Sequence, residues 1–174
     1  NSISQAALSF TGQNIGAQRY DRIAKIMRTC AMVVTVTGIV LGALVTLCSE
    51  PLLHLFINEE TEASAIADVI HNGQIRLEII CLTYFLDGLM EVFSSMLRGM
   101  GSAIIPTLVT VVGICGVRMV WIYTIFAAEH MLNVLYLSYP VSWLLTSATL
   151  FFCYLYVHKK LMRSVSVAPT AAAV

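Results

Sequence analysis

The sequence predicts an all-α fold, a polytopic transmembrane helix bundle, and three observations support this prediction. Of the 174 residues, 58% are hydrophobic and only 11% are charged, and the mean hydropathy is +0.82. Long uncharged stretches alternate with short segments in which charged residues gather. A helix of about 20 apolar residues crosses the hydrocarbon core of a bilayer, because it satisfies its own backbone hydrogen bonds. Soluble domains contain about 45–50% apolar residues, so a soluble fold could not bury this much apolar surface.

Four complete spans and the end of a preceding helix fit this pattern. The opening stretch is too short to span and reaches the polar sequence GQNIGA at 12–17, after which a basic connector follows. Glu50-Pro51 is expected to end the first complete span, since proline after a long apolar run readily terminates a helix. A short helix at 61–72 is expected to lead into the second. The complete spans are expected at 29–49, 75–97, 103–126 and 132–157.

These elements divide the chain into three parts. Residues 1–27 form the end of a transmembrane helix and a basic cytoplasmic connector, and residues 28–160 form a four-span membrane unit. Residues 161–174 form a cytoplasmic tail of low complexity, which is expected to be disordered. The chain opens at Asn1 with neither an initiator methionine nor a signal sequence, so it is expected to be a segment of a longer protein.

The distribution of lysine and arginine predicts the orientation in the membrane. The connector at 14–28, the turn at 98–102 and the segment after 157 are assigned to one side. That side then holds the basic residues Arg19, Arg22, Lys25, Arg28, Arg98, Lys159, Lys160 and Arg163. The other side holds only Arg76. By the positive-inside rule the crowded side is cytoplasmic, which places the C-terminus inside and the acidic segment at 50–74 outside.

Composition and motifs argue against several classes of function. The ten basic and ten acidic residues balance, so net charge does not suggest a nucleic-acid partner. The five cysteines lie scattered in apolar stretches without C-x-x-C spacing, and we interpret them as packing residues rather than metal ligands or disulfides. The sequence contains no phosphate-binding loop, dinucleotide fingerprint or nucleophile motif. No enzyme activity, metal or organic cofactor is therefore expected.

Three segments carry a family resemblance. They are GQNIGAQRYDRIAK at 12–25 with Gln13, Gly16 and Ala17, EPLLHLF at 50–56, and LRGMGSAIIP at 97–106 with Arg98, Gly99 and Pro106. In this order and spacing they resemble the multidrug and toxic compound extrusion (MATE) family of efflux transporters. In that family a Gln-x-x-Gly-Ala connector follows the second helix of each six-helix half, and a Leu-Arg-Gly turn with a downstream proline joins the fourth helix to the fifth.

The resemblance implies a fold and a function. The family consists of two similar six-helix lobes that face each other across a central cavity. This chain resembles the C-terminal lobe from the end of the eighth helix to the twelfth, so its partners would include membrane lipid and the N-terminal half of the same protein. The implied function is antiport in the plasma membrane, in bacteria the inner membrane. Small organic, often cationic, drugs or toxins would leave by alternating access in exchange for H⁺ or Na⁺.

Charged residues inside the spans are candidate functional residues, because an unpaired charge in lipid is costly. Asp87 lies near the middle of the second span and Glu91 four residues later, so both carboxylates project from one face of a helix. Arg118 is the only basic residue of the third span. These three residues and Tyr84 are the candidates for ion coupling or substrate contact. Two neighbouring carboxylates repel each other when both are charged, which favours binding of a proton or Na⁺.

The resemblance adds a detail on the coupling ion. Some family members carry an acidic residue eleven positions before the arginine of Leu-Arg-Gly, and a tyrosine four positions before that acid. Asp87 stands eleven positions before Arg98, but Thr83 occupies the tyrosine position and Tyr84 follows one step later. This departure argues against Na⁺ coordination of that type.

Alternative interpretations remain open at this point. Asp87 or Glu91 could pair with Arg118 across adjacent helices and only fix their packing. The protein could instead be a flippase of related fold for lipid-linked precursors or polysaccharides, or a membrane scaffold subunit that transports nothing.

The family-motif residues are interpreted as structural. Four glycines are expected to let helices approach closely: Gly38, Gly42, Gly113 and Gly116.

Overall fold

The computed structural model describes residues 2–54, 63–129 and 132–167, and every regular element in these ranges is helical. The α-helices are α1 (Ser2–Gly16), α2 (Ile23–Leu47), α3 (Ser49–His54), α4 (Ala63–Gly99), α5 (Ile104–Val111), α6 (Val117–Trp121), α7 (Ala127–Glu129) and α8 (Leu132–Val167). A 3-10 turn, η1 (Tyr20–Arg22), precedes α2, and two π-helical segments, η2 (Val112–Gly116) and η3 (Ile122–Phe126), flank α6.

Four helical stretches are long and apolar enough to cross a membrane: Tyr20–Leu47, Ile70–Gly99, Ile104–Phe126 and Leu132–Ser164. They coincide with the four predicted spans, so the prediction of an all-α bundle with four spans is confirmed. The first span ends slightly before the predicted Glu50-Pro51, at Leu47. Pro51 then falls in the first turn of α3, where its missing N–H is tolerated.

Two predicted boundaries are wrong. The short helix expected at 61–72 is no separate element in the described part of the chain, because α4 runs without a break from Ala63 to Gly99. The tail expected to be disordered from 161 is helical to Val167, where α8 ends, while 168–174 lie outside the described residues. The basic sequence HKKLMR continues α8, since lysine and arginine favour helices.

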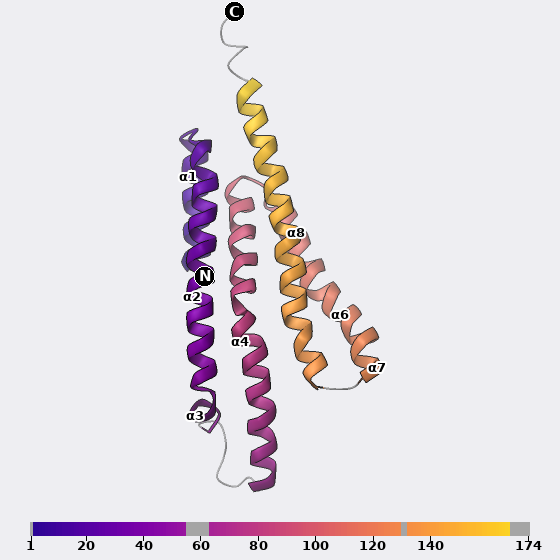
Figure 1. Cartoon of the computed structure of the whole chain (residues 1–174). Coiled ribbons are helices and arrows are strands. Elements are labelled where there is room, and N and C mark those ends of the chain that lie inside the picture. The colour runs from indigo at the N-terminus through magenta and orange to yellow at the C-terminus, as the bar shows by residue number, and fades with distance from the viewer. Residues whose placement is uncertain (1, 55–62, 130–131, 168–174) are drawn as a thin grey trace, which may run out of the picture.

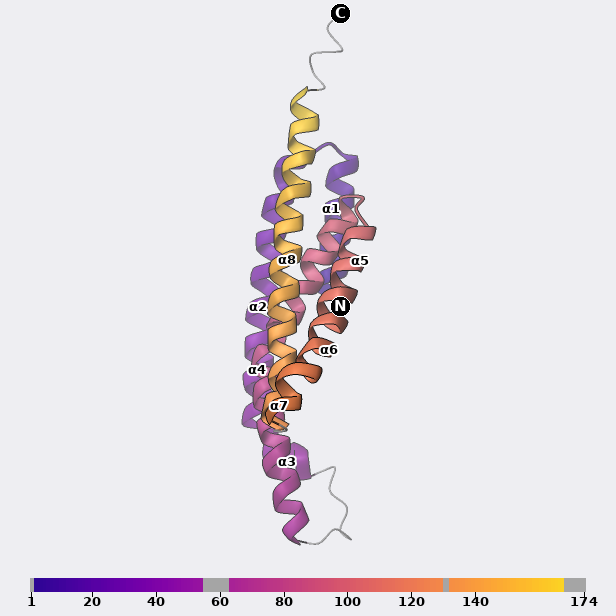
Figure 2. The same ribbon diagram turned by 90° about the vertical axis from the view of Figure 1, so that its right-hand side faces the viewer.

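Helix α4 is the central element of the bundle. It contacts α1, α2 and α8, whereas the segment from α5 to η3 packs chiefly along α8. Figure 1 shows α4 between α2 and α8, with α6 and α7 beyond α8, and Figure 2 shows the α5–α7 segment running beside α8. A side chain on α4 can therefore face α2 on one side or α8 on the other.

The basic segments gather at one end of the bundle. Figure 1 places the α1–α2 turn, the α4–α5 turn and the C-terminal end of α8 toward its upper end, and α3 with the start of α4 at its lower end. The eight basic residues that the sequence assigns to one side therefore occupy the same end of the molecule. This arrangement is the one that the positive-inside rule requires.

Both turns at this end close in the same way. In the first, the Arg19 N–H donates to the Asn14 carbonyl at 2.7 Å, and Gln18 between them has a φ of 55°. In the second, the Ser102 N–H donates to the carbonyl five residues earlier at 3.0 Å, and Gly101 has a φ of 85°. These are Schellman caps, which need one residue in the left-handed region. Glycine adopts that region without strain, which explains the second glycine of RGMG.

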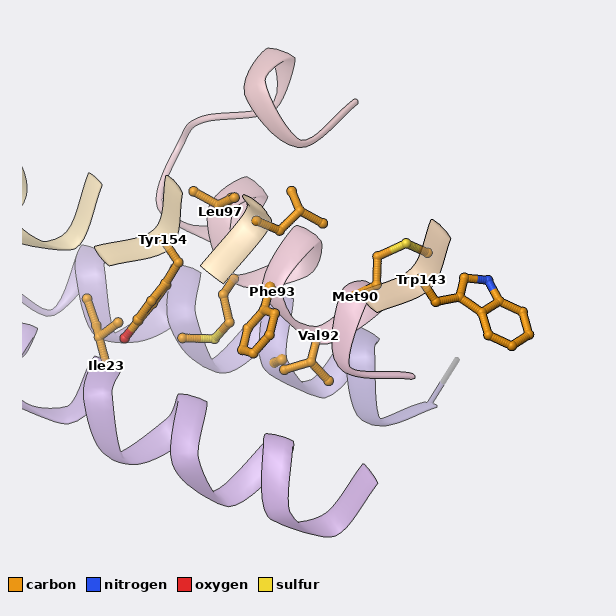
Figure 3. Close-up of a cluster of buried hydrophobic side chains, with 10 residues drawn as sticks. Ile23, Met90, Val92, Phe93, Leu97, Trp143 and Tyr154 are labelled. Atoms are coloured by element: carbon orange, nitrogen blue, oxygen red, sulfur yellow. The ribbon is translucent and has the colours of Figure 1, made fainter. Parts of the chain in front are cut away.

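Ten buried hydrophobic side chains form a core where α4 meets α1, the start of α2, and α8 (Figure 3). They are Ala7, Ile23, Met90, Val92, Phe93, Met96, Leu97, Trp143, Leu150 and Tyr154. By contrast, α2 and α5 expose many large apolar side chains, such as Val40 at 58% and Leu108 at 60%. Such faces suit contact with lipid or with further transmembrane helices.

Glycines allow close helix contacts at three of the four expected positions. A Cβ on Gly38 would lie 2.8 Å from the Phe85 Cβ, and one on Gly42 would overlap the Cys81 carbonyl oxygen, so α2 meets α4 there almost backbone to backbone. A Cβ on Gly113 would overlap the Thr146 side chain of α8. Among the described residues, Gly116 meets only a side chain of its own helical segment, so the expectation does not hold for it there.

Gly42→Ala is expected to destabilise the protein. The added methyl group would collide with a backbone oxygen of α4, which cannot rotate away, and overpacking of this kind costs about 1–3 kcal/mol. Gly12→Ala is the matched control, because a Cβ there meets nothing within 4 Å and alanine favours a helix. Thermal unfolding of the detergent-solubilised protein should show a lower midpoint for Gly42→Ala alone. Equal midpoints would contradict the close α2–α4 contact.

Candidate functional site

A cleft of about 570 Å³ lies between α1, α2 and α4. Its walls combine apolar and aromatic groups with two acidic side chains. The residues that line it include Val34, Leu41, Val45, Tyr84, Phe85, Asp87, Glu91 and Val92. This volume falls within the range of small-molecule sites, about 300–1,000 Å³.

Helical periodicity brings the acidic residues into the cleft together. Asp87 and Glu91 are four residues apart on α4, and Tyr84 stands one turn before Asp87, so all three share a face. Opposite them, α2 contributes glycines at Gly38 and Gly42, which put no side chain into the space. The structure thus places both predicted carboxylates and Tyr84 along one cleft, near the middle of the candidate span.

The two carboxylates are half-buried and have no basic neighbour in the cleft wall. No lysine or arginine lines the cleft in the described part of the chain, and no ion pair joins Arg118 to Asp87 or Glu91 in the ranges that the structure covers. Asp87 and Arg118 thus form no direct ion pair among the described residues, although the Arg118 charge acts on Asp87 at longer range. Two acidic groups facing the same open space create a region of negative potential, which attracts a proton, a metal cation or an organic cation.

Arg118 lies against α8 rather than in the cleft. Its Nε donates a hydrogen bond to the Ser142 Oγ at 3.1 Å. Its guanidinium carbon lies 4.1 Å from the centre of the Tyr139 ring and 5.9 Å from that of Trp143. The charge is thus held by aromatic faces and a hydroxyl group, and cation–π contacts of this kind stabilise a desolvated guanidinium.

An aromatic contact connects this arginine site to the cleft. Trp143 is 6% exposed and meets the Tyr84 ring edge-on, with centroids 5.9 Å apart and an interplanar angle of 89°. Tyr139, Ser142 and Trp143 were not identified from the sequence. Their spacing of three and four residues on the predicted fourth span was the available signal, because it puts all three on one helix face.

The family-motif residues lie at the two turns and not in the cleft. Gln13, Gly16 and Ala17 end α1, while Arg98 is exposed at the end of α4. A Cβ on Gly99 would lie 2.8 Å from the Thr11 Cβ, so this glycine lets α4 approach α1. Pro106 is buried in the first turn of α5.

Within the ranges described, no three His, Cys, Asp or Glu side chains are placed to hold a metal ion, and the five cysteines are free thiols.

Comparisons with known proteins agree with the helical architecture. A family model described as MatE matches residues 1–124. A curated protein of Bacillus subtilis (strain 168), named "Probable multidrug resistance protein YoeA", is 25% identical over 161 residues, which are 91% of this chain and 33% of that protein. The chain therefore spans about a third of the length of this relative.

Proposed function

Since the chain belongs to the MatE family of membrane transporters, we propose that it is part of a secondary antiporter that exports small organic, often cationic, drugs or toxins in exchange for H⁺ or Na⁺. The printed name of the B. subtilis relative refers to multidrug resistance, which supports export of drug-like compounds. The observation that carries the proposal is the cleft, in which Asp87 and Glu91 face apolar and aromatic walls near the middle of a membrane span.

The composition of the cleft suits a lipophilic cation. Val34, Leu41 and Phe85 supply apolar surface, Tyr84 supplies an exposed aromatic ring, and the carboxylates supply negative charge. An aromatic face attracts organic cations through cation–π contacts, and a neighbouring carboxylate adds the attraction of a negative charge. Wide apolar walls with few fixed hydrogen bonds also tolerate varied ligands, which multidrug export requires.

The same carboxylates provide a reason for exchange. A proton and an organic cation each neutralise the acidic pair, so binding of one weakens binding of the other. An empty, doubly charged cleft is costly to close off from water in the membrane, because unpaired charges would be buried. Closure and reorientation therefore occur with either the drug or the coupling ion bound, and transport of one substrate drives countertransport of the other.

The surroundings of Asp87 favour H⁺ as the coupling ion. The Thr83 hydroxyl donates to the Ile79 carbonyl of its own helix at 2.5 Å, and Thr83 does not line the cleft. A dehydrated Na⁺ needs several oxygen ligands, whereas a proton needs only one carboxylate oxygen.

The positive-inside rule gives the orientation in the plasma membrane. We place on the cytoplasmic side the end of the bundle that carries the basic turns and the C-terminal end of α8.

The experiment is reconstitution of the complete protein into liposomes with a pH-sensitive dye inside. An outward gradient of a lipophilic cation should drive proton movement in the opposite direction in Na⁺-free buffer. Substrate-dependent Na⁺ flux without proton movement would assign the coupling to Na⁺. Movement of a lipid-linked precursor instead of the cation would favour a flippase, and the absence of any flux would favour a scaffold and contradict the proposal.

A further inference from the structure

Arg118 belongs to a short helix that is fixed to α8 at two points. Helix α6 lies between the π-helical segments η2 and η3, which are rare in proteins and often occur at functional positions. Arg118 and Trp121 stand three residues apart and share a face. Arg118 donates to Ser142, and the Trp121 indole N–H donates to the Val134 carbonyl at 2.9 Å. Both bonds hold α6 against α8.

The contacts of Arg118 fix the orientation of one face of α8. Ser142 is fully buried, accepts the Arg118 Nε–H and donates its own hydroxyl to the Tyr139 carbonyl at 2.9 Å. The guanidinium lies over the Tyr139 ring, and Tyr139 meets Trp143 with ring centroids 5.9 Å apart. The planar guanidinium can stack on a ring and donate an in-plane hydrogen bond at once, which an ammonium group cannot do.

Trp143 connects the Arg118 contacts to the cleft. Trp143 also packs edge-on against Tyr84, which lies on α4 and lines the cleft beside Asp87. Tyr84 is 55% exposed, and its hydroxyl has no hydrogen bond within the described ranges. The edge-on contact with Trp143 therefore restrains the Tyr84 ring where no hydrogen bond does.

We propose that Arg118 is a positioning residue that acts through Trp143 to hold Tyr84 in place as the aromatic wall of the cleft. This role is separate from the long-range electrostatic interaction of Arg118 with Asp87. The proposal extends the proposed function, because it makes Arg118 of the third span a determinant of specificity for aromatic cations. No side chain of that span lines the cleft itself. Only its consequence for transport rests on that proposed function.

The direct test uses ¹⁹F NMR of the purified complete protein labelled with 3-fluorotyrosine. The Tyr84 resonance is assigned by its loss in Tyr84→Phe. Arg118→Lys should shift this resonance, and Ser142→Ala should shift it less. In a Trp143→Phe background, Arg118→Lys should produce no further shift. The matched control is Arg76→Lys, an exposed basic residue on the helix that carries Tyr84, which should leave the resonance unchanged.

Two results of this test would overturn the proposal. One is a Tyr84 resonance that Arg118→Lys leaves at its wild-type position. The other is a shift of equal size with and without Trp143. Neither result depends on transport, so they are distinguishable from a failure of the proposed function, which would appear as a wild-type protein that moves no cation.

Transport kinetics provide the second test. Arg118→Lys and Tyr84→Ala should each raise the KM for an aromatic cation about two- to ten-fold, the range expected for loss of one aromatic contact. The KM of the double variant should not exceed that of the more severe single variant, since both substitutions act on the same aromatic contact of Tyr84. For a compact aliphatic cation the KM should change little. A fall in Vmax with an unchanged KM for both cations would indicate a merely structural role and contradict the proposal.

Discussion

Asp87→Asn is expected to abolish substrate-driven ion exchange and to leave the folded protein intact. The amide occupies the same volume as the carboxylate but carries no negative charge and accepts no proton at physiological pH. Asp87 makes no direct ion pair or hydrogen bond in the described part of the chain, so its replacement removes only longer-range electrostatic interactions, such as that with Arg118. In inverted membrane vesicles, proton efflux in response to the organic cation should fall to the background of vesicles that lack the protein.

Glu78→Gln is the matched control for this prediction. Glu78 is an exposed carboxylate on the same helix, but it does not line the cleft. It should therefore exchange ions at the wild-type rate. Glu91→Gln should also lower exchange, because the proposed exchange depends on both carboxylates of the pair in the cleft. The opposite pattern for Asp87→Asn, with coupled efflux preserved and a lower unfolding temperature, would show that Asp87 serves packing rather than coupling.

Tyr154→Ala is expected to have a large effect on stability. Tyr154 is 1% exposed and belongs to the buried cluster of α4 and α8 (Figure 3). Truncation of a large buried aromatic side chain costs about 3–5 kcal/mol in soluble proteins. In a membrane the hydrophobic contribution to this cost is smaller, because lipid is as apolar as the protein core. The lost packing contacts remain, so we expect the free energy of unfolding to fall by on the order of 2 kcal/mol. Thermal unfolding midpoints of the complete protein in lipid-detergent mixtures measure the loss.

Two further substitutions make this prediction sharper. Tyr156→Ala removes the same group two residues later, where the side chain is 69% exposed, and it should leave the midpoint almost unchanged. Tyr154→Phe should be neutral or stabilising, because the buried Tyr154 hydroxyl has no hydrogen-bond partner among the described residues. Equal, small effects of Tyr154→Ala and Tyr156→Ala would contradict the assignment of this cluster as the core.

The spans and the acidic face were predictable from the sequence because both depend on local properties. Hydropathy over about 20 residues defines a span wherever its neighbours lie. The helical repeat puts Asp87 and Glu91 on one face whatever that face contacts. The resemblance to MATE transporters likewise depended on three short local motifs, at 12–25, 50–56 and 97–106. That family assignment is confirmed by the match over residues 1–124.

The partners of Arg118 were not predictable in this way. Ser142 and Trp143 lie more than 20 positions away in the sequence, and the contact depends on how the third and fourth spans are rotated about their axes. The π-helical segments on both sides of α6 change that rotation, because each turn holds more residues than an α-helical turn. The same effect separates Gly113, which faces α8, from Gly116, which does not.

The central claim is that the coupling ion and the organic cation compete for the acidic pair in the cleft. Proton release on substrate binding tests it most directly, with the purified complete protein in weakly buffered detergent solution. A saturating lipophilic cation should release protons in proportion to the substrate bound by the wild-type protein. The double variant of Asp87→Asn and Glu91→Gln should release none. Equal proton release by both proteins, or substrate binding to the wild type with no release of H⁺ or Na⁺, would contradict the account.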